Sequence, residues 1–191
     1  MSPFLRHALS TCAVAVMLSR PGTAQSVPPA GPAGPAAQSA FDFEFGIWDT
    51  KLRRRLEPLT GSERWVECTG LSTVRKVWDG RANLGELELT CPSGRLQGLS
   101  LRLFDPGSQQ WHIRWANAAD AELGPPMIGG FDSAGRGEFY NQELFRGKAI
   151  FVRFIFSEVT PRSFRLEQAF SADGGSSWEA NWIATFVKRG P

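Results

Sequence analysis

Hydrophobic and polar residues alternate with a period of two along most of this chain, most clearly in residues 164–188. Two alternating runs there flank the turn 173–176, which reads Asp-Gly-Gly-Ser. The aspartate can cap backbone amides, and the two glycines accept the positive φ angles of a tight turn. The stretch therefore predicts an antiparallel β-hairpin.

Similar alternating runs recur from residue 46 onward, with turn sequences such as Asp79-Gly80 and Asp105-Pro106-Gly107 between them. No heptad pattern, internal repeat or long helical periodicity accompanies them. Short links predict a meander, and a meander of about ten strands loses its edges by closing on itself. We therefore expect an all-β fold, a single up-and-down antiparallel β-barrel of about ten strands, with a flat or sandwiched sheet as the alternative. The expected strands are 46–56, 63–78, 84–91, 95–104, 110–117, 127–131, 137–145, 149–156, 163–170 and 178–187.

The first 40 residues differ from the rest in composition. Residues 1–24 contain a basic start, an apolar run over 8–18 and the small residues Gly22-Thr23-Ala24, which together predict a signal peptide. Residues 25–40 are rich in Pro, Ala and Gly and predict a disordered linker, so the barrel domain is expected to span 41–191. We expect secretion to the periplasm, without membrane insertion because no later stretch approaches ~18 apolar residues.

The expected mature chain is electrically balanced. Cleavage after residue 24 removes Arg6 and Arg20, which lowers the 21 basic residues to 19, against 19 acidic ones. A neutral domain without a basic stripe predicts no nucleic-acid partner.

The segment 41–49, Phe-Asp-Phe-Glu-Phe-Gly-Ile-Trp-Asp, resembles the G-x-W opening of lipocalin-like (calycin) barrels, with Gly46 and Trp48 in the motif positions. Nearly all of residues 41–188 resembles a bacterial family of lipocalin-like domains of unknown function. The resemblance implies a lipocalin or fatty-acid-binding-protein type of barrel and no established activity. It also implies that a basic residue of the last strand stacks on Trp48. Lys188 and Arg189 are the candidates, and the alternation from Trp182 through Phe186 places Lys188 on that face. Further segments that carry the resemblance are 73–75, 101–106, 111–116, 137–140, 167–175 and 181–182.

Motifs that specify chemistry by their spacing are absent from the sequence, including G-x-S-x-G, C-x-x-C, H-E-x-x-H and a phosphate-binding glycine loop. Residues 171–178 match the Asp-box pattern S-x-D-x-G-x-S-W, in which Asp173 and Trp178 have structural roles. His112 is the only histidine after the predicted cleavage site, and we keep haem ligation by it as a minor alternative. We expect no metal and no other cofactor.

Polar side chains among the aromatic residues of individual strands are the candidates for ligand contact. If Ala172 lies opposite Ser177, Gln168 lies opposite Asn181 on an otherwise apolar face, as an orienting amide pair in a pocket does. The opposite face is also mixed, so the alternation leaves open which face points inward. The candidate ligand-binding residues are Arg114, Trp115, Glu138, Tyr140, Glu167, Gln168 and Asn181.

The sequence thus predicts an exported barrel that binds a small, partly apolar molecule in its interior. One alternative is an isomerase, lyase or hydratase with Glu138 or Glu167 as general base. A second alternative is a structural envelope module with a filled core.

The two cysteines that remain after cleavage, Cys68 and Cys91, are expected to form a disulfide. If Asp79-Gly80 is a two-residue turn, Trp78 faces Arg81, and the same register places Cys68 directly opposite Cys91. Two buried free thiols are the alternative, which a bulge in either strand would favour.

Overall fold

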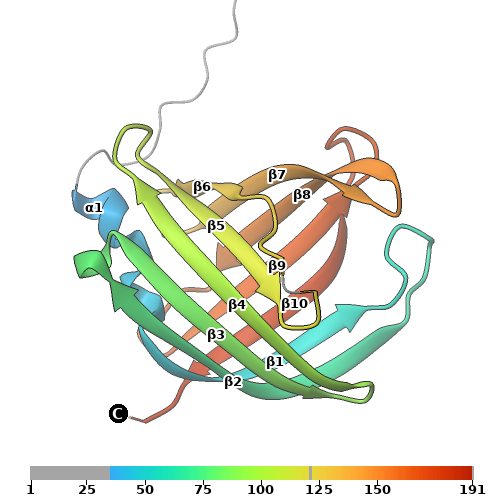
Figure 1. Cartoon of the computed structure of the whole chain (residues 1–191), viewed down its shortest axis with the longest axis horizontal. Helices are drawn as coiled ribbons and strands as arrows, with labels where there is room; N and C mark the ends of the chain where they lie inside the picture. The colour runs from blue at the N-terminus through green and yellow to red at the C-terminus, as the bar shows by residue number, and fades with distance from the viewer. Residues whose placement is uncertain (1–34, 121, 191) are drawn as a thin grey trace, which may run out of the picture.

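The computed structural model describes residues 35–120 and 122–190, and these fold into a closed antiparallel barrel of ten strands (Figure 1). The predicted fold class is confirmed, and most strand ends lie within two residues of their predicted positions. The strands are β1 (Gly46–Arg55), β2 (Trp65–Val77), β3 (Ala82–Cys91), β4 (Gly94–Asp105), β5 (Gln110–Asn117), β6 (Met127–Phe131), β7 (Gly137–Phe145), β8 (Lys148–Ser157), β9 (Ser163–Ser171) and β10 (Glu179–Lys188).

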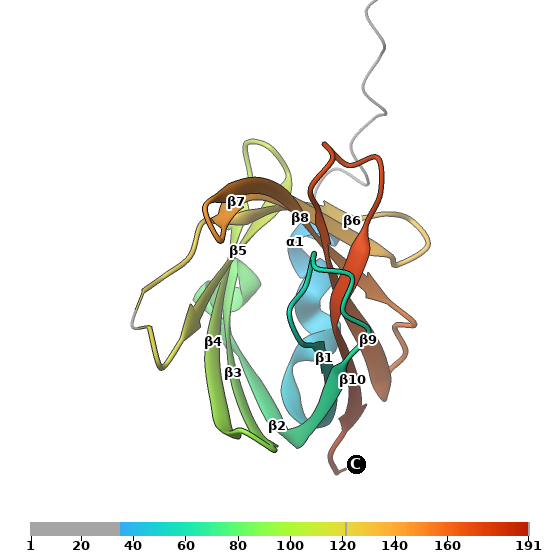
Figure 2. The same cartoon turned by 90° about the vertical axis from the view of Figure 1, so that its right-hand side faces the viewer.

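Each strand pairs with its neighbours in sequence, and β1 pairs with β10 to close the ring. The helical segments α1 (Pro35–Gln38) and η1 (Ser39–Glu44) lie at one end of the barrel, which we call the closed end (Figures 1 and 2). Helical structure thus begins at Pro35, inside the range predicted as linker. The predicted signal peptide and residues 25–34 lie outside the described residues.

Packing at the closed end is centred on Phe41, which is fully buried. Its ring contacts the rings of Trp111, Phe131 and Phe156 edge-on, with centroids 5.1, 4.9 and 5.3 Å away. Edge-to-face pairs of this kind add to the free energy gained by burying the rings. The backbone of the helical segment is fixed as well, because Trp111 Nε1 donates a hydrogen bond to the Ala37 carbonyl at 2.9 Å.

Close approach of strands β2 and β3 depends on Gly70. A β-carbon built at this position would lie 2.0 Å from the Glu88 carbonyl oxygen on β3, so any larger residue would force the strands apart.

The predicted disulfide between Cys68 and Cys91 is confirmed, with a Cα–Cα distance of 4.3 Å. Strands β2 and β3 keep the predicted register, since Val77 pairs with Ala82 and Thr69 pairs with Thr90. The turn between them is a single 3-10 turn, η2 (Trp78–Gly80). None of the described helices has the length and hydropathy needed to cross a membrane.

Candidate functional site

The barrel encloses a cavity of about 470 Å³ that opens at the end opposite η1, which we call the mouth. The β1–β2 loop, the β5–β6 loop and the β7–β8 turn border this opening. Strand alternation places one face of each strand inside, so the lining combines residues from most of the barrel. Its apolar members include Leu87, Ile113, Trp115, Met127, Phe145, Val152, Phe154, Phe156, Phe164, Leu166, Phe170, Trp182 and Phe186.

Trp115 and Trp182 form an aromatic pair in this lining, with ring centroids 6.2 Å apart. The indole of Trp115 lies against strand β4 at Gly98, where a β-carbon would be only 1.9 Å from the ring. Glycine is therefore required at position 98, because any side chain would push the indole into the cavity.

Glu44 and Arg102 form an ion pair where the cavity meets the closed end. Arg102 Nη1 lies 2.5 Å from Glu44 Oε2 and donates a hydrogen bond of 2.9 Å to Asn83 Oδ1. The pair is deeply buried, with Glu44 1% and Arg102 8% exposed, and the Arg102 guanidinium also lies over the Phe41 ring. Burial raises the pKa of Glu44, and the charge of Arg102 opposes this increase.

Gln168 and Asn181 form a second polar group nearer the mouth. Gln168 Nε2 donates to Asn181 Oδ1 at 2.7 Å, and both residues line the cavity. The register differs from the predicted one, because a bulge between Ala180 and Trp182 places Trp182 rather than Asn181 opposite Gln168. The bulge turns Asn181 inward, where it is 4% exposed and its Nδ2 donor has no hydrogen-bond partner in the described chain.

Asn141 and Glu143 are a third polar group, on the inward face of β7. Strand β7 pairs with β8 along its whole length but with β6 only as far as Tyr140, so this pair borders the mouth. Desolvation raises the pKa of Glu143, and a hydrogen bond from Asn141 partly offsets the increase. Asn141 Oδ1 is buried without a partner among the described residues.

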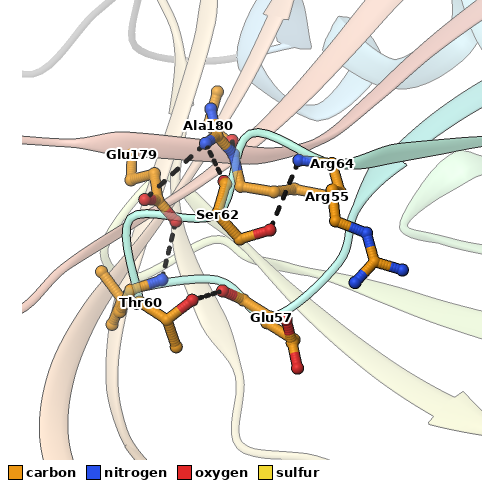
Figure 3. Close-up of polar contacts among 8 residues, drawn as sticks. Arg55, Glu57, Thr60, Ser62, Arg64, Glu179 and Ala180 are labelled. Atoms are coloured by element: carbon orange, nitrogen blue, oxygen red, sulfur yellow. Dashed lines mark hydrogen bonds and ion pairs between the residues drawn. The ribbon is translucent and has the colours of Figure 1, made fainter.

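The β1–β2 loop at the rim is tied to β10 by polar contacts (Figure 3). Arg55 donates from Nε to the Ala180 carbonyl at 3.0 Å and from Nη1 to the Ser62 carbonyl at 2.6 Å. The Leu59 amide donates to Glu179 Oε1 at 2.8 Å. The loop is therefore held in place beside the opening.

The structure divides the candidate ligand-binding residues between the two faces of the sheet. Trp115, Gln168 and Asn181 line the cavity, whereas the other four do not. Those four have partners elsewhere: Arg114 donates to the Gly124 carbonyl at 3.1 Å, Tyr140 to Glu138 at 2.7 Å, and Arg165 to Glu167 at 2.6 Å. The alternative enzyme that used Glu138 or Glu167 as general base thus has neither carboxylate in the cavity.

The residues assigned structural roles lie at the two ends of the barrel. Lys188 Nζ lies 5.3 Å from the centre of the buried Trp48 ring. Gly46 has a φ of 127°, and a β-carbon built there would lie 3.3 Å from Lys188 Cε. Asp173 accepts hydrogen bonds from the Ser177 amide and hydroxyl, which lower its pKa to about 2. Trp178 packs under the Arg153 guanidinium, 4.5 Å away.

The cavity residues that the sequence analysis did not predict include Glu44, Arg102, Asn141 and Glu143. Glu143 alternates with Phe139 and Phe145, so its inward position follows once those aromatic residues are assigned to the core. Glu44 and Arg102 come from distant segments, and no local pattern pairs them. His112 lies between the inward residues Trp111 and Ile113 and is not part of the lining. The described chain contains no group of three or more His, Cys, Asp or Glu side chains able to hold a metal.

Comparisons with known proteins support the fold without identifying a family. No protein-family model and no curated protein matches the chain. Among solved structures, the S-type phycobiliprotein lyase CPES from Guillardia theta aligns with a TM-score of 0.55 at 10% identity, covering 79% of this chain and 91% of the lyase. EF1p2_mFAP2b bound to DFHBI aligns with a TM-score of 0.45 at 9% identity, over 80% of this chain and 99% of the other. The likeness to the lyase shows that the barrel architecture is shared.

Proposed function

We propose that this protein binds a small, partly apolar molecule inside the barrel. The observation that carries the proposal is the cavity of about 470 Å³, a mainly apolar chamber. Its wall contains buried polar atoms without hydrogen-bond partners among the described residues, and two of them, Asn141 Oδ1 and Asn181 Nδ2, lie away from the closed-end ion pair. Small-molecule sites usually have volumes of roughly 300–1,000 Å³ and a few placed polar groups in an apolar lining. Buried polar atoms are nearly always hydrogen-bonded, so these two atoms are suited to a ligand.

A purely structural role fits the interior less well. A module without a ligand would be expected to fill its core to the density of other protein interiors, where voids larger than a water molecule are few. The interior here instead contains a mainly apolar space that is open at one end and bordered by the β1–β2 loop.

The proposed site of action is the periplasm. The disulfide between Cys68 and Cys91 is of the kind that persists in oxidising compartments, and residues 1–24 have the composition of a signal peptide. Export predicts a mature chain that begins near Gln25, which N-terminal sequencing of the protein from the periplasmic fraction tests.

The binding proposal is tested by filling the cavity. Leu166→Trp places an indole inside the chamber, and Thr185→Trp places one on the exposed outer face of β10. The fluorescence of the neutral dye N-phenyl-1-naphthylamine should increase when it is mixed with the parent protein or with Thr185→Trp. The increase with Leu166→Trp should be at least about tenfold smaller. Organic extraction of protein purified from its native cells should yield a small molecule that the Leu166→Trp protein lacks. Equal fluorescence with both variants, together with an empty extract, would contradict the proposal.

A further inference from the structure

We propose that the ligand carries a protonated basic nitrogen and that Glu143 is its counter-ion. The inference rests on the proposed function and specifies the chemistry of the same cavity. The expected ligand is a small amine with an aromatic or otherwise apolar body, whose ammonium group lies at the mouth beside Glu143 and Asn141.

Glu44 and Glu143 are the shielded carboxylates of the cavity wall, since the other two, Glu57 and Glu86, are exposed, and they differ in their partners. Glu44 has Arg102 Nη1 at 2.5 Å, so its charge is balanced within the fold. Glu143 takes part in no ion pair among residues 35–120 and 122–190, and no neighbouring charge accounts for its pKa. A carboxylate in an apolar chamber is costly unless it is paired, so Glu143 is a site for a cation.

The hydrogen-bonding groups around Glu143 also favour a ligand that donates hydrogen bonds. Asn141 donates to Glu143, which leaves the acceptor Asn141 Oδ1 buried and unpartnered on the same face of the strand. Asn141 and Glu143 thus offer hydrogen-bond acceptors that no donor of the described residues fills. A primary ammonium group has three donors and no acceptor, and it satisfies both residues at once. A carboxylate ligand would meet only like charge and further acceptors at this point.

Aromatic rings line the same cavity as Glu143. Phe145 follows Glu143 on the inward face of β7, and its ring packs on Phe170 with centroids 5.1 Å apart. Phe154, Trp115 and Trp182 belong to the same lining. Aromatic faces attract cations, and the gain rises when water is excluded. The apolar body of an amine would therefore pack against rings that also favour its charge.

The arginines at the rim do not reverse the preference of the cavity for a cationic ligand. Arg55 is engaged with Ala180, Ser62 and Glu179, and the Arg146 guanidinium lies 5.2 Å from the Phe145 ring centre. Arg54 and Arg146 are exposed, so water and salt screen their charges. The half-buried carboxylate of Glu143 is screened less and acts on the ligand inside the chamber.

Three probes of similar size test the charge preference of the cavity at pH 8: the amine 2-(1-naphthyl)ethylamine, the alcohol 2-(1-naphthyl)ethanol and the carboxylate 1-naphthaleneacetate. Isothermal titration calorimetry and quenching of tryptophan fluorescence give the dissociation constants. We expect the amine to bind at least about tenfold more tightly than the alcohol, since a hydrogen bond to a charged group contributes about 1.5–3 kcal/mol. The acetate should bind most weakly. The order of the three affinities should persist in 0.5 M NaCl because the charge that determines it, on Glu143, is inside the chamber.

The Glu143→Gln variant should reduce the amine-to-alcohol ratio to near one while the affinity for the alcohol stays within about twofold. Glu138→Gln, on the outer face, is the matched control and should leave all three affinities unchanged. Asn141→Ala removes the second acceptor and should lower the amine preference by about threefold or more, which provides an independent variant if Glu143→Gln does not fold.

The outcomes separate this inference from the proposed function. Equal binding of amine and alcohol, tightest binding of the acetate, or an unchanged ratio in Glu143→Gln would overturn the amine assignment and leave the binding function in place. Failure of all three probes, together with the failure of N-phenyl-1-naphthylamine, would overturn both.

Discussion

The closed end and the mouth of the cavity contain similar polar residues in opposite states. At the closed end, the Glu44 carboxylate meets Arg102, and Arg102 in turn meets Asn83, under a layer of packed aromatic rings. At the mouth, the Glu143 carboxylate has only the Asn141 amide. The charge of Glu44 is thus balanced within the protein, although Glu44 Oε1, Asn83 Nδ2 and Arg102 Nε have no hydrogen-bond partner among the described residues. The charge of Glu143 has no counter-ion among those residues.

The difference separates polar groups that stabilise the fold from polar groups that are available for binding. A buried charge whose counter-ion comes from the chain contributes to stability or to a unique packing. A charge without a counter-ion in the chain reduces stability, and proteins retain such charges where function requires them. The closed end should therefore respond to substitution mainly through stability, and the mouth mainly through binding.

The largest expected effect is at the closed end, in Arg102→Met. This substitution leaves the Glu44 carboxylate buried without its cation, which should cost about 3–5 kcal/mol of unfolding free energy. Urea denaturation followed by tryptophan fluorescence measures the loss. Arg54→Met, which removes an exposed arginine from the mouth, should change stability by less than about 0.5 kcal/mol. A loss of under 1 kcal/mol in Arg102→Met would show that the closed-end pair does not stabilise the fold.

The second effect concerns the disulfide, which joins β2 to β3 where these strands approach the mouth. Cys68 and Cys91 are separated by 23 residues, and a bridge over a loop of that length contributes about 3 kcal/mol. The double variant Cys68→Ala, Cys91→Ala should therefore unfold at lower urea concentration, and reduction of the parent protein should have a similar effect. A midpoint unchanged by both treatments would mean that the covalent link adds no stability there.

Much of the architecture was predictable from sequence because its signals are local. Turn residues and alternation gave strand positions close to those observed, and the register through Asp79-Gly80 brought Cys68 to Cys91. The resemblance around Gly46 and Trp48 pointed to the same barrel. The sequence did not predict which face of each strand points into the barrel, because both faces contain polar and apolar residues and the alternation is compatible with either orientation.

The candidate site was predicted only in part because its contacts are not local. The bulge at Asn181 changes the side chain that faces Gln168, and one extra residue in a strand leaves no periodic signal. Glu44 joins Arg102 only after η1 has packed against the barrel, so neither residue stands out in its own segment. Glu138 and Glu167 drew attention as carboxylates among aromatic residues, but both sit on the outer face, and Glu143 sits inside.

A smaller effect is expected where the two regions meet, in Gln168→Leu. The Gln168 amide is the donor to Asn181 Oδ1, so its loss leaves a second polar atom of Asn181 unpartnered. The expected cost is about 1–2 kcal/mol, lower than at the closed end because no charge is exposed to the apolar interior. Asn181→Ala in the same background should recover part of the loss, and a double-mutant cycle measures the coupling. Strictly additive losses would contradict the pairing.

The smallest expected effect is a gain in stability rather than a loss. Glu143→Gln removes a charge that the fold does not balance, so stability at pH 7 should rise by about 0.5 kcal/mol, a modest figure because the side chain is only partly shielded from water. Burial raises the pKa of Glu143 above its ordinary value of 4.5, so the folded state holds this proton more tightly than the unfolded state does. The parent protein therefore loses stability as pH rises through the raised pKa.

The gain from Glu143→Gln should accordingly be full above that pKa and smallest at about pH 4, where the carboxyl group is mostly protonated in both states. Thermal unfolding from pH 4 to pH 8 measures the difference between the two proteins. Adding 2-(1-naphthyl)ethylamine at pH 8 should reverse their order, because only the parent protein gains the charge-assisted contact and ligand binding adds to its stability. A variant that is less stable at every pH would assign Glu143 to the fold, as Glu44 is, and would remove the contrast between the two ends of the cavity.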